Sequence, residues 1–536
     1  MSRAYRELSE GLPPGAVTAN PPPPAGGRAL KQWIDDLPRQ NIVRTGEFIR
    51  DAGFSAMSTP MSGADRFNQL ETLRPAAIET ILWLERQFLN SPLPLADERL
   101  SAAILAQQLH MAMADGYRMA CVELCHPDGK IPLLRGGNVA VAIGRGLWHY
   151  TQALQLTWKI YRDPPEGVWL GLHRLYRFAA ESKLHQKTVD DPLVPGGYRP
   201  QLEYTQTALL ALVNPLAFAP AEQDRIRQLV SECDGHCVVT GPSGSEHRAP
   251  LPQDEMRPVE LDEDAGYIDF AQFYETLSTA AAAAHDGVAV LTPPGGRVEA
   301  PVALLRRMLR ALGQAAARGA PRLPGGFALE TAVGLSAVHY FAAGRMDFDG
   351  YIQNLSRLGS QGIRLGADWL HAGEHAVHRL LTAQVLDHGL GGYRLQWPAG
   401  QQPRARIGEL VGLNGAAPGL EPDWMLGVIR WLRYGADGGL MAGVELLSRR
   451  CLAVAVRPGA DHRGQPVRAL ALQAMDDGSA PGYVLAGRLE KPMSGFDVLY
   501  GYEPYRLGPP TGVRTVKASV AHAALAMDYT LLTEES

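Results

Sequence analysis

The sequence predicts a multidomain α+β protein with an N-terminal α-helical scaffold and a C-terminal antiparallel β-barrel, which carries an insertion and a further β extension. Two observations support this fold class. Apolar residues recur at steps of three and four as far as about residue 233. Beyond residue 300 they alternate at period two, in short runs separated by Gly, Pro and Asn. A chain of 536 residues has room for several domains of about 150 residues each.

The composition narrows the class of protein. With 51 Lys and Arg against 56 Asp and Glu, the net charge is −5, so no overall positive field attracts a polynucleotide. The odd number of cysteines, five, argues against a secreted disulfide framework. No run approaches the ~18 uninterrupted apolar residues of a membrane span. We therefore expect a cytoplasmic protein without membrane insertion and without a polynucleotide partner.

The N-terminal half is expected to be a disordered tail followed by helices. Residues 1–27 are rich in Pro and Gly, which favours extended, solvated backbone. Residues 28–240 are expected to form the α-helical domain, with Asn138 capping a helix that runs to Trp158. Shorter helices are expected at 205–213 and 221–230. The clearest apolar stripe of the domain consists of Leu70, Leu73, Ala77, Ile81, Leu84 and Phe88.

Residues 241–300 are expected to be a linker with short helices, because the first part is Pro-rich and acidic. A helix at 302–317 then leads into the barrel.

The barrel is expected to span residues 301–460, with an insertion at 342–380. Short strands at regular spacing are typical of a closed antiparallel barrel, which leaves no exposed sheet edge. The first strand is expected to end at His339 and Tyr340. Weaker alternation at 461–536 predicts a β-rich extension or a second small barrel. The expected barrel strands are 327–335, 381–386, 393–397, 407–413, 424–433, 443–447 and 452–456.

Two short motifs carry the chemistry. Arg318 and Arg322 form an R-x-x-x-R pattern in a stretch rich in Gly and Pro, just before the first strand. The planar guanidinium fork pairs with phosphate or with the O6 and N7 edge of guanine. Asp387, Gly389 and Gly392 lie between two expected strands, where a carboxylate accepts hydrogen bonds from N–H groups and glycine permits close backbone approach.

With these motifs, residues 318–456 resemble the PilZ family, cytoplasmic receptors for the bacterial second messenger cyclic di-GMP. Members carry R-x-x-x-R before the first barrel strand and [D/N]-x-S-x-x-G after the second. The resemblance implies that Arg318 and Arg322 hold phosphates and guanine faces, that Asp387 takes a guanine edge, and that Gly392 is the final motif glycine. It also implies a signalling effector that relays cyclic di-GMP to an unidentified protein partner, with no catalytic residues, no metal and no cofactor besides the ligand.

The chain departs from the family pattern in two ways. Gly389 stands where the family has serine, and a lost hydrogen bond is worth ~0.5–1.5 kcal/mol, or up to about tenfold in affinity. The distance between Arg322 and Asp387 also requires the insertion at 342–380. Long insertions are tolerated because closure entropy grows only with the logarithm of length, and this one is placed where it could cover the ligand site.

Two alternatives remain open. The barrel could be a degenerate, non-enzymatic scaffold that binds no nucleotide, because fold alone does not settle function. The other alternative is a zinc hydrolase. His371, Glu374 and His375 read as H-x-x-E-H, although Gly373 weakens the helix that this motif needs. The cysteines Cys121, Cys125, Cys233 and Cys237 also have spacings compatible with structural zinc.

Overall fold

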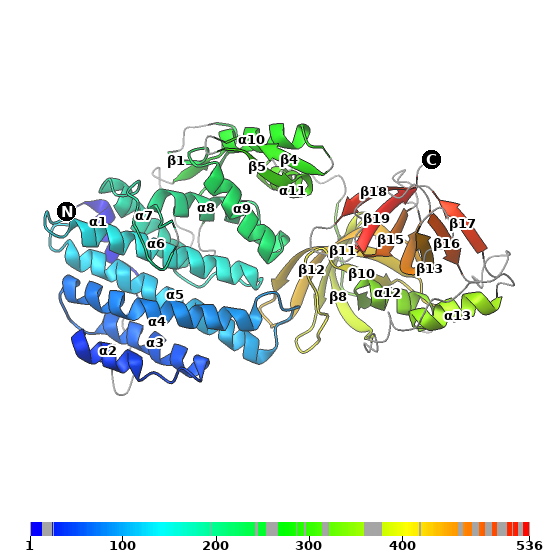
Figure 1. Cartoon of the computed structure of the whole chain (residues 1–536), viewed down its shortest axis with the longest axis horizontal. Coiled ribbons are helices and arrows are strands. Elements are labelled where there is room, and N and C mark those ends of the chain that lie inside the picture. The colour runs from blue at the N-terminus through cyan, green and yellow to red at the C-terminus, as the bar shows by residue number, and fades with distance from the viewer. Residues whose placement is uncertain are drawn as a thin grey trace. The chain divides into compact units, whose positions relative to one another are not determined.

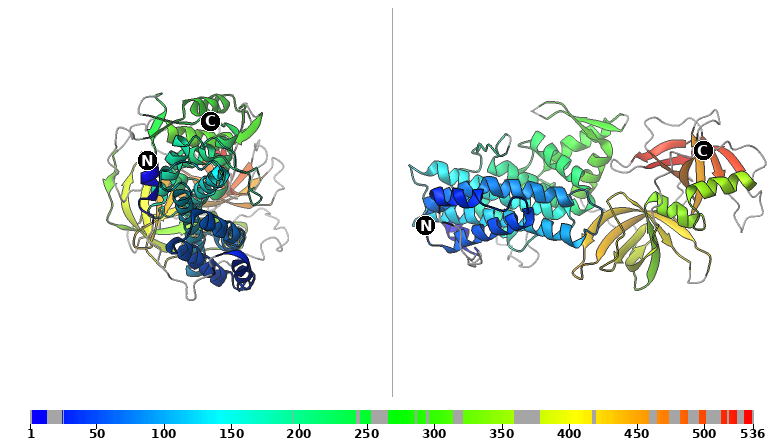
Figure 2. Two further views of the ribbon diagram at one scale, coloured as in Figure 1. Left: turned by 90° about the vertical axis from the view of Figure 1, so that its left-hand side faces the viewer. Right: turned by 60° about the horizontal axis from the view of Figure 1, so that its bottom comes forward.

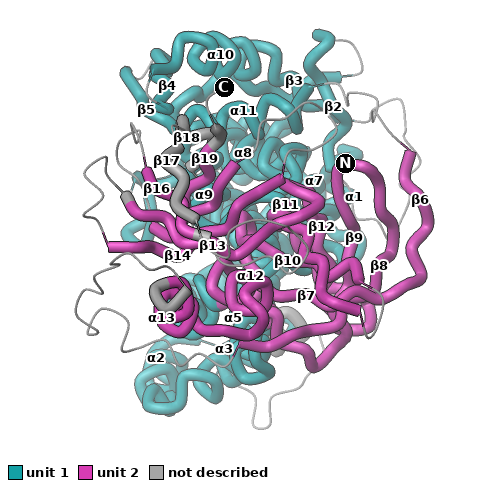
Figure 3. Tube along the Cα trace, turned by 90° about the vertical axis from the view of Figure 1, so that its right-hand side faces the viewer, with its two compact units in different colours: residues 1–91, 95–317 teal, residues 92–94, 318–536 magenta. Residues whose placement is uncertain are grey.

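The structure is a computed structural model in which the chain divides into two compact units. The first consists of Met1–Ser91 and Leu95–Ala317, and the second of Pro92–Pro94 and Arg318–Ser536 (Figure 3). The residues that the structure describes are 2–12, 24, 26–194, 196–241, 245–252, 266–285, 287–293, 296–313, 321–358, 378–416, 420–458, 465–473, 482–487, 496–500, 512–516, 518–523 and 529–534.

Long helices dominate the first unit (Figures 1 and 2). The predicted apolar stripe of α4 is buried from Leu70 to Phe88, and α5 packs against both α4 and α6. The helices are α1 (Arg3–Ser9), α2 (Gly27–Asp35), α3 (Ile42–Ser58), α4 (Gly63–Phe88), α5 (Asp97–Leu124), α6 (Gly136–Lys159), α7 (Val168–Glu181), α8 (Pro200–Leu212) and α9 (Pro220–Glu232).

Two details of the helical prediction are wrong. Residues 3–9 of the expected disordered tail form α1, which is held in place because Tyr5 and Leu8 are buried and the Tyr5 hydroxyl donates to the Val122 carbonyl at 2.8 Å. Residues 13–23 and 25 lie outside the described part of the chain. Asn138 does not cap α6, because the chain is already helical at Gly136 and Arg135 is the N-cap residue.

The expected linker contains β-strands as well as helices. A short sheet has the strand order β1-β3-β2, and β4 pairs with β5. Helix α11 ends at Leu312, because Gly313 takes extended backbone. Arg307 of α11 donates to Glu222 at 2.6 Å, which ties this helix to α9. The elements are β1 (Val238–Thr240), β2 (Arg248–Pro250), β3 (Tyr267–Asp269), α10 (Ala271–Ala282), β4 (Val288–Leu291), β5 (Val298–Pro301) and α11 (Val302–Leu312).

A polar network is buried among the helices of the first unit. The Arg74 and Asp191 side chains are fully buried, with Nη2 and Oδ2 2.6 Å apart. Arg74 Nε also lies 3.3 Å from Nε2 of His149, whose Nδ1 lies 2.9 Å from Nδ1 of His110. Arg145 reaches the same Asp191 carboxylate at 3.8 Å. Buried charges of this kind are tolerated only when they are paired.

The second unit contains the predicted closed barrel. Six antiparallel strands follow the cyclic order β8-β7-β10-β11-β12-β9, and β9 pairs again with β8. Trp397 is fully buried in this barrel, and its Nε1 donates to Thr331 Oγ1 at 2.9 Å. A short strand, β6 (Leu323–Pro324), precedes β7 and pairs with the part of β8 that lies beyond the first residue of β7. The barrel strands are β7 (Ala328–Val333), β8 (Leu381–Gly389), β9 (Gly392–Trp397), β10 (Leu410–Asn414), β11 (Trp424–Tyr434) and β12 (Leu440–Ser448).

The first barrel strand is shorter than predicted. It ends at Val333, and Gly334, with φ +94°, turns the chain into helix α12 (Leu335–Ala342). His339 and Tyr340 therefore belong to a helix. Residues of α12 share one apolar core with strands of the barrel and of a second sheet, and this core includes Val338, Phe341, Trp424, Leu426, Leu470 and Val484.

The second sheet is antiparallel with the order β17-β16-β13-β14-β15-β19-β18. Strand β13 joins this sheet, so the prediction that 452–456 belongs to the barrel is wrong. Helix α13 (Phe348–Leu358) packs on it through Tyr351 and Ile352. Helix α13, which belongs to the expected insertion, thus lies against this sheet. The strands are β13 (Cys451–Pro458), β14 (Val467–Leu472), β15 (Gly482–Ala486), β16 (Phe496–Tyr500), β17 (Gly512–Val516), β18 (Ala518–Ala523) and β19 (Tyr529–Glu534).

Candidate ligand-binding site

The segment that carries Arg322 is fixed along strand β8. Strand β6 follows Arg322 directly and pairs Pro324 with Asp387. The Gly325 N–H then donates to the Leu386 carbonyl at 3.1 Å. A Cβ on Gly325 would lie 1.9 Å from the Val385 carbonyl oxygen, so only glycine fits there. Arg318 lies outside the described residues.

Arg322 and Asp387, 65 residues apart in the chain, form an ion pair. Arg394 binds the other carboxylate oxygen, with its Nε 2.7 Å from Oδ2 of Asp387. These side chains are only partly covered, with 39% of Arg322, 17% of Asp387 and 44% of Arg394 exposed. The arrangement is a carboxylate held between two solvent-accessible guanidinium groups.

The tip of the β8–β9 hairpin completes this site. Gly389 pairs with Gly392 across a two-residue turn, and the Leu390 carbonyl accepts from Arg449 at 3.2 Å. A Cβ on Gly392 would lie 2.0 Å from the Val444 carbonyl oxygen, whereas a Cβ on Gly389 would meet Pro321 at an ordinary 3.5 Å. Packing therefore requires glycine at position 392 but permits a side chain at position 389.

Sequence reasoning missed Arg394. The signal was present, because a two-residue turn at Leu390 and Gly391 places Arg394 directly opposite Asp387, as the structure shows. Directly paired residues on one face of an antiparallel ladder have Cβ atoms about 4.5–5.5 Å apart. Two arginines against one aspartate leave an excess of positive charge, which suits a phosphate-bearing ligand.

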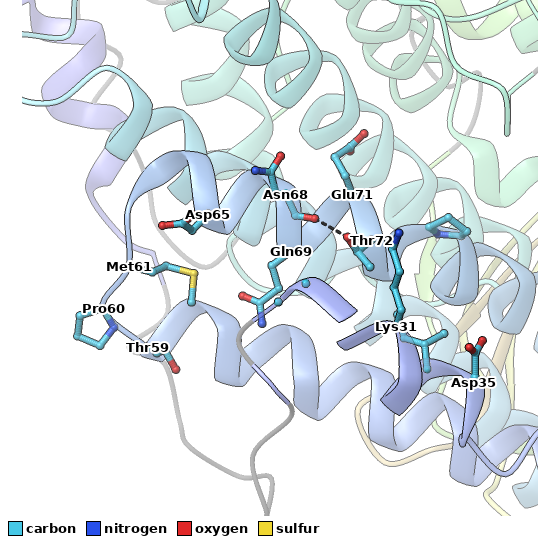
Figure 4. Close-up of a pocket in the computed structure, with 14 residues that line it drawn as sticks. Lys31, Asp35, Thr59, Pro60, Met61, Asp65, Asn68, Gln69, Glu71 and Thr72 are labelled. Atoms are coloured by element: carbon cyan, nitrogen blue, oxygen red, sulfur yellow. Dashed lines mark hydrogen bonds between the residues drawn. The ribbon is translucent and has the colours of Figure 1, made fainter. Parts of the chain in front are cut away.

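A hollow also lies in the first unit, between α2 and α4 (Figure 4). Its volume is about 1070 Å³. Lys31 lines it together with three acidic residues, Asp35, Asp65 and Glu71. Since carboxylates outnumber the cationic group, this hollow is unsuited to a phosphate-bearing ligand.

The zinc alternatives gain no support from the described residues. His371, Glu374 and His375 lie outside them. Cys121, Cys125, Cys233 and Cys237 are all buried free thiols, and burial raises the pKa of Cys125 to about 11. Within the described ranges, no three His, Cys, Asp or Glu residues form a group that could hold a metal ion. Nor does any helix in those ranges have the length and apolar character needed to cross a membrane.

Comparison with known proteins covers both units. Residues 28–243 match the family model described as the N-terminal domain of the cyclic-di-GMP receptor FimW. Residues 247–368 and 366–452 match its middle PilZ domain. Over 522 residues, the chain is 26% identical to the cyclic-di-GMP receptor FimW of Pseudomonas aeruginosa, an alignment that covers 86% of this chain and 84% of that protein.

Proposed function

On the premise that the chain belongs to the PilZ-domain family of cyclic di-GMP receptors, we propose that it binds cyclic di-GMP on the outer face of its barrel. The observation that carries this proposal is the contact between Arg322 and Asp387, which brings the two family motifs together. Arg318, Gly389 and Gly392 complete the proposed site, with Arg318 assigned from the motif alone.

In this proposal the ligand exchanges one ion pair for another. Arg322 bonds Asp387 in the free protein and turns to a phosphate or a guanine when the messenger arrives. Arg394 keeps its bond to the second carboxylate oxygen, so Asp387 stays oriented toward guanine N–H groups. Charge-assisted bonds of this kind are roughly twice as strong as neutral ones.

We further propose that the protein acts by binding rather than by catalysis. It would work in the cytoplasm and relay the messenger to a protein partner, without a metal or another cofactor. The relay would follow if the ligand binds one conformation of the protein more tightly than others.

Calorimetric titration with cyclic di-GMP tests the site. Arg322→Ala is expected to weaken binding by about 2-fold to 10-fold, because the bond that Arg322 makes to the ligand replaces its bond to Asp387, and a net hydrogen bond is worth ~0.5–1.5 kcal/mol. Arg406→Ala removes an exposed arginine from the same unit and should leave affinity unchanged. Silence of the wild-type protein at high micromolar ligand would instead favour the degenerate scaffold.

Gly389→Ser should strengthen binding of cyclic di-GMP by up to about tenfold, because it restores the hydroxyl of the family motif. The position tolerates a side chain, since its Cβ would meet Pro321 at 3.5 Å. Titration of the variant beside the wild type measures the change. Weaker binding by a variant of unchanged thermal stability would show that this strand end does not face the ligand.

A further inference from the structure

A second hollow, of about 380 Å³, lies in the second unit and is lined by residues of β8 and β9. Its lining includes Gly326, Gln384, Leu386, Gln396, Pro398 and Asp437. The hollow is at the small end of the range for ligand pockets, so it suits one base rather than a whole dinucleotide. None of the residues that line it is a lysine or an arginine.

The strand register places this hollow on the same face as the proposed site. Arg394 and Gln396 are two residues apart on β9, so they point to the same side about 7 Å apart along the strand. Their partners on β8 are Asp387 and Gln384, which are three residues apart. A regular strand would turn these two to opposite faces.

A β-bulge resolves this mismatch. The register skips Leu386, since Val385 pairs with Leu395 and Asp387 with Arg394. The extra residue brings Asp387 onto the face that Gln384 occupies, which is a common use of bulges at binding sites. Leu386 itself lines the hollow. The hollow and the arginine-bound carboxylate are therefore neighbouring parts of one surface.

Asp437 is held in position before any ligand arrives. Its Oδ2 accepts from Gln396 Nε2 at 2.7 Å, and its Oδ1 accepts from the Gly439 N–H at 3.0 Å. The loop between β11 and β12 is closed by a 2.7 Å bond from the Gly435 N–H to the Gly439 carbonyl. A carboxylate has about four lone-pair positions, so these two bonds leave capacity for two further donors.

We propose that this hollow is a guanine subsite, in which Asp437 accepts hydrogen bonds from N1–H and the N2 amino group of one base of the messenger. The amides of Gln384 and Gln396 supply donors for guanine O6. Adenine presents a lone pair at N1, which a carboxylate repels. The Asp437 carboxylate also repels a phosphate, because both groups carry negative charge. This proposal rests on the proposed function, and it gives a binding position to one of the two bases of the messenger.

The test measures base preference in the full chain. Wild type and Asp437→Asn are titrated with cyclic di-GMP and with mixed cyclic GMP–AMP, in which adenine replaces one guanine. A bidentate contact discriminates between bases by about 5-fold to 150-fold. We expect Asp437→Asn to lose cyclic di-GMP affinity by a factor in this range and to lose most of its preference over the mixed nucleotide. Glu421→Gln, which neutralises an exposed carboxylate of the same unit, is the matched control.

A second variant distinguishes loss of the subsite from disruption of the loop that carries Asp437. Gln384→Leu alters the exposed face of β8 and leaves the bond between Gln396 and Asp437 in place. It should weaken cyclic di-GMP several-fold at unchanged thermal stability. The subsite is wrong, and the proposed function stands, if the wild type binds cyclic di-GMP and Arg322→Ala loses affinity while Asp437→Asn and Gln384→Leu behave as the wild type. If the wild type binds no cyclic di-GMP, the proposed function and the subsite fail together.

Discussion

Arg74→Met is expected to lower the free energy of unfolding of the first unit by about 3–5 kcal/mol, because it leaves a buried carboxylate without its main partner. Arg74 contacts both oxygens of Asp191, with Nη1 to Oδ1 at 3.0 Å and Nη2 to Oδ2 at 2.6 Å. Burial raises the pKa of Asp191, but the hydrogen bonds from Arg74 and the Leu193 N–H, with the charges of Arg74 and Arg145, outweigh it, so the net shift is downward. After the substitution, Arg145 remains, and it is 3.8 Å away.

Urea unfolding followed by the helical circular-dichroism signal measures this loss. The double variant Arg74→Met with Asp191→Leu should recover most of it, since replacing a buried ion pair with apolar side chains is often nearly neutral. Arg39→Met is the matched control, because Arg39 pairs with Glu79 in solvent, with more than half of each side chain exposed, and such pairs contribute less than about 1 kcal/mol. Equal losses for Arg74→Met and Arg39→Met would refute the argument.

This network was not predictable from the sequence. Arg74 and Asp191 lie in different helical-domain segments and look like ordinary surface charges. By contrast, the apolar stripe of α4 predicted its helix, because the period continues over several turns. The alternation from 327 to 335 predicted a strand correctly only as far as Val333. After Gly334 the chain forms helix α12, whose apolar residues pack against strands of both sheets.

The candidate site, too, was predicted only in part from the sequence. The motifs predicted which residues belong together, and the structure brings Arg322 to Asp387. The strand pattern did not show that β13 leaves the barrel, because alternation predicts a strand without assigning it to a sheet. Asp437 carries no local signal either, since its relation to Gln396 depends on the register of β9 and β12.

The free energy of unfolding should fall steeply as the pH drops below about 6.5. Burial first, and then the charge of Arg74, lower the pKa of His110 to about 3. Burial also lowers the pKa of His173 to about 4, although its bond to the Pro252 carbonyl opposes the shift. In the unfolded chain both histidines titrate near 6.5. Below that pH the unfolded state binds protons that the folded state excludes, so stability is lost as the pH falls.

Each such histidine should cost about 2 kcal/mol between pH 7 and pH 5, with little change above pH 7. Urea unfolding at several pH values measures the slope. Burial raises the pKa of Asp115 and Glu203, which gives a slope of opposite sign and makes comparison of variants necessary. His110→Gln should remove about 2 kcal/mol of the pH-dependent loss, whatever its effect at pH 7. His285→Gln, at an exposed position, is the matched control. An unchanged slope for His110→Gln would mean that His110 accepts a proton within the folded helices.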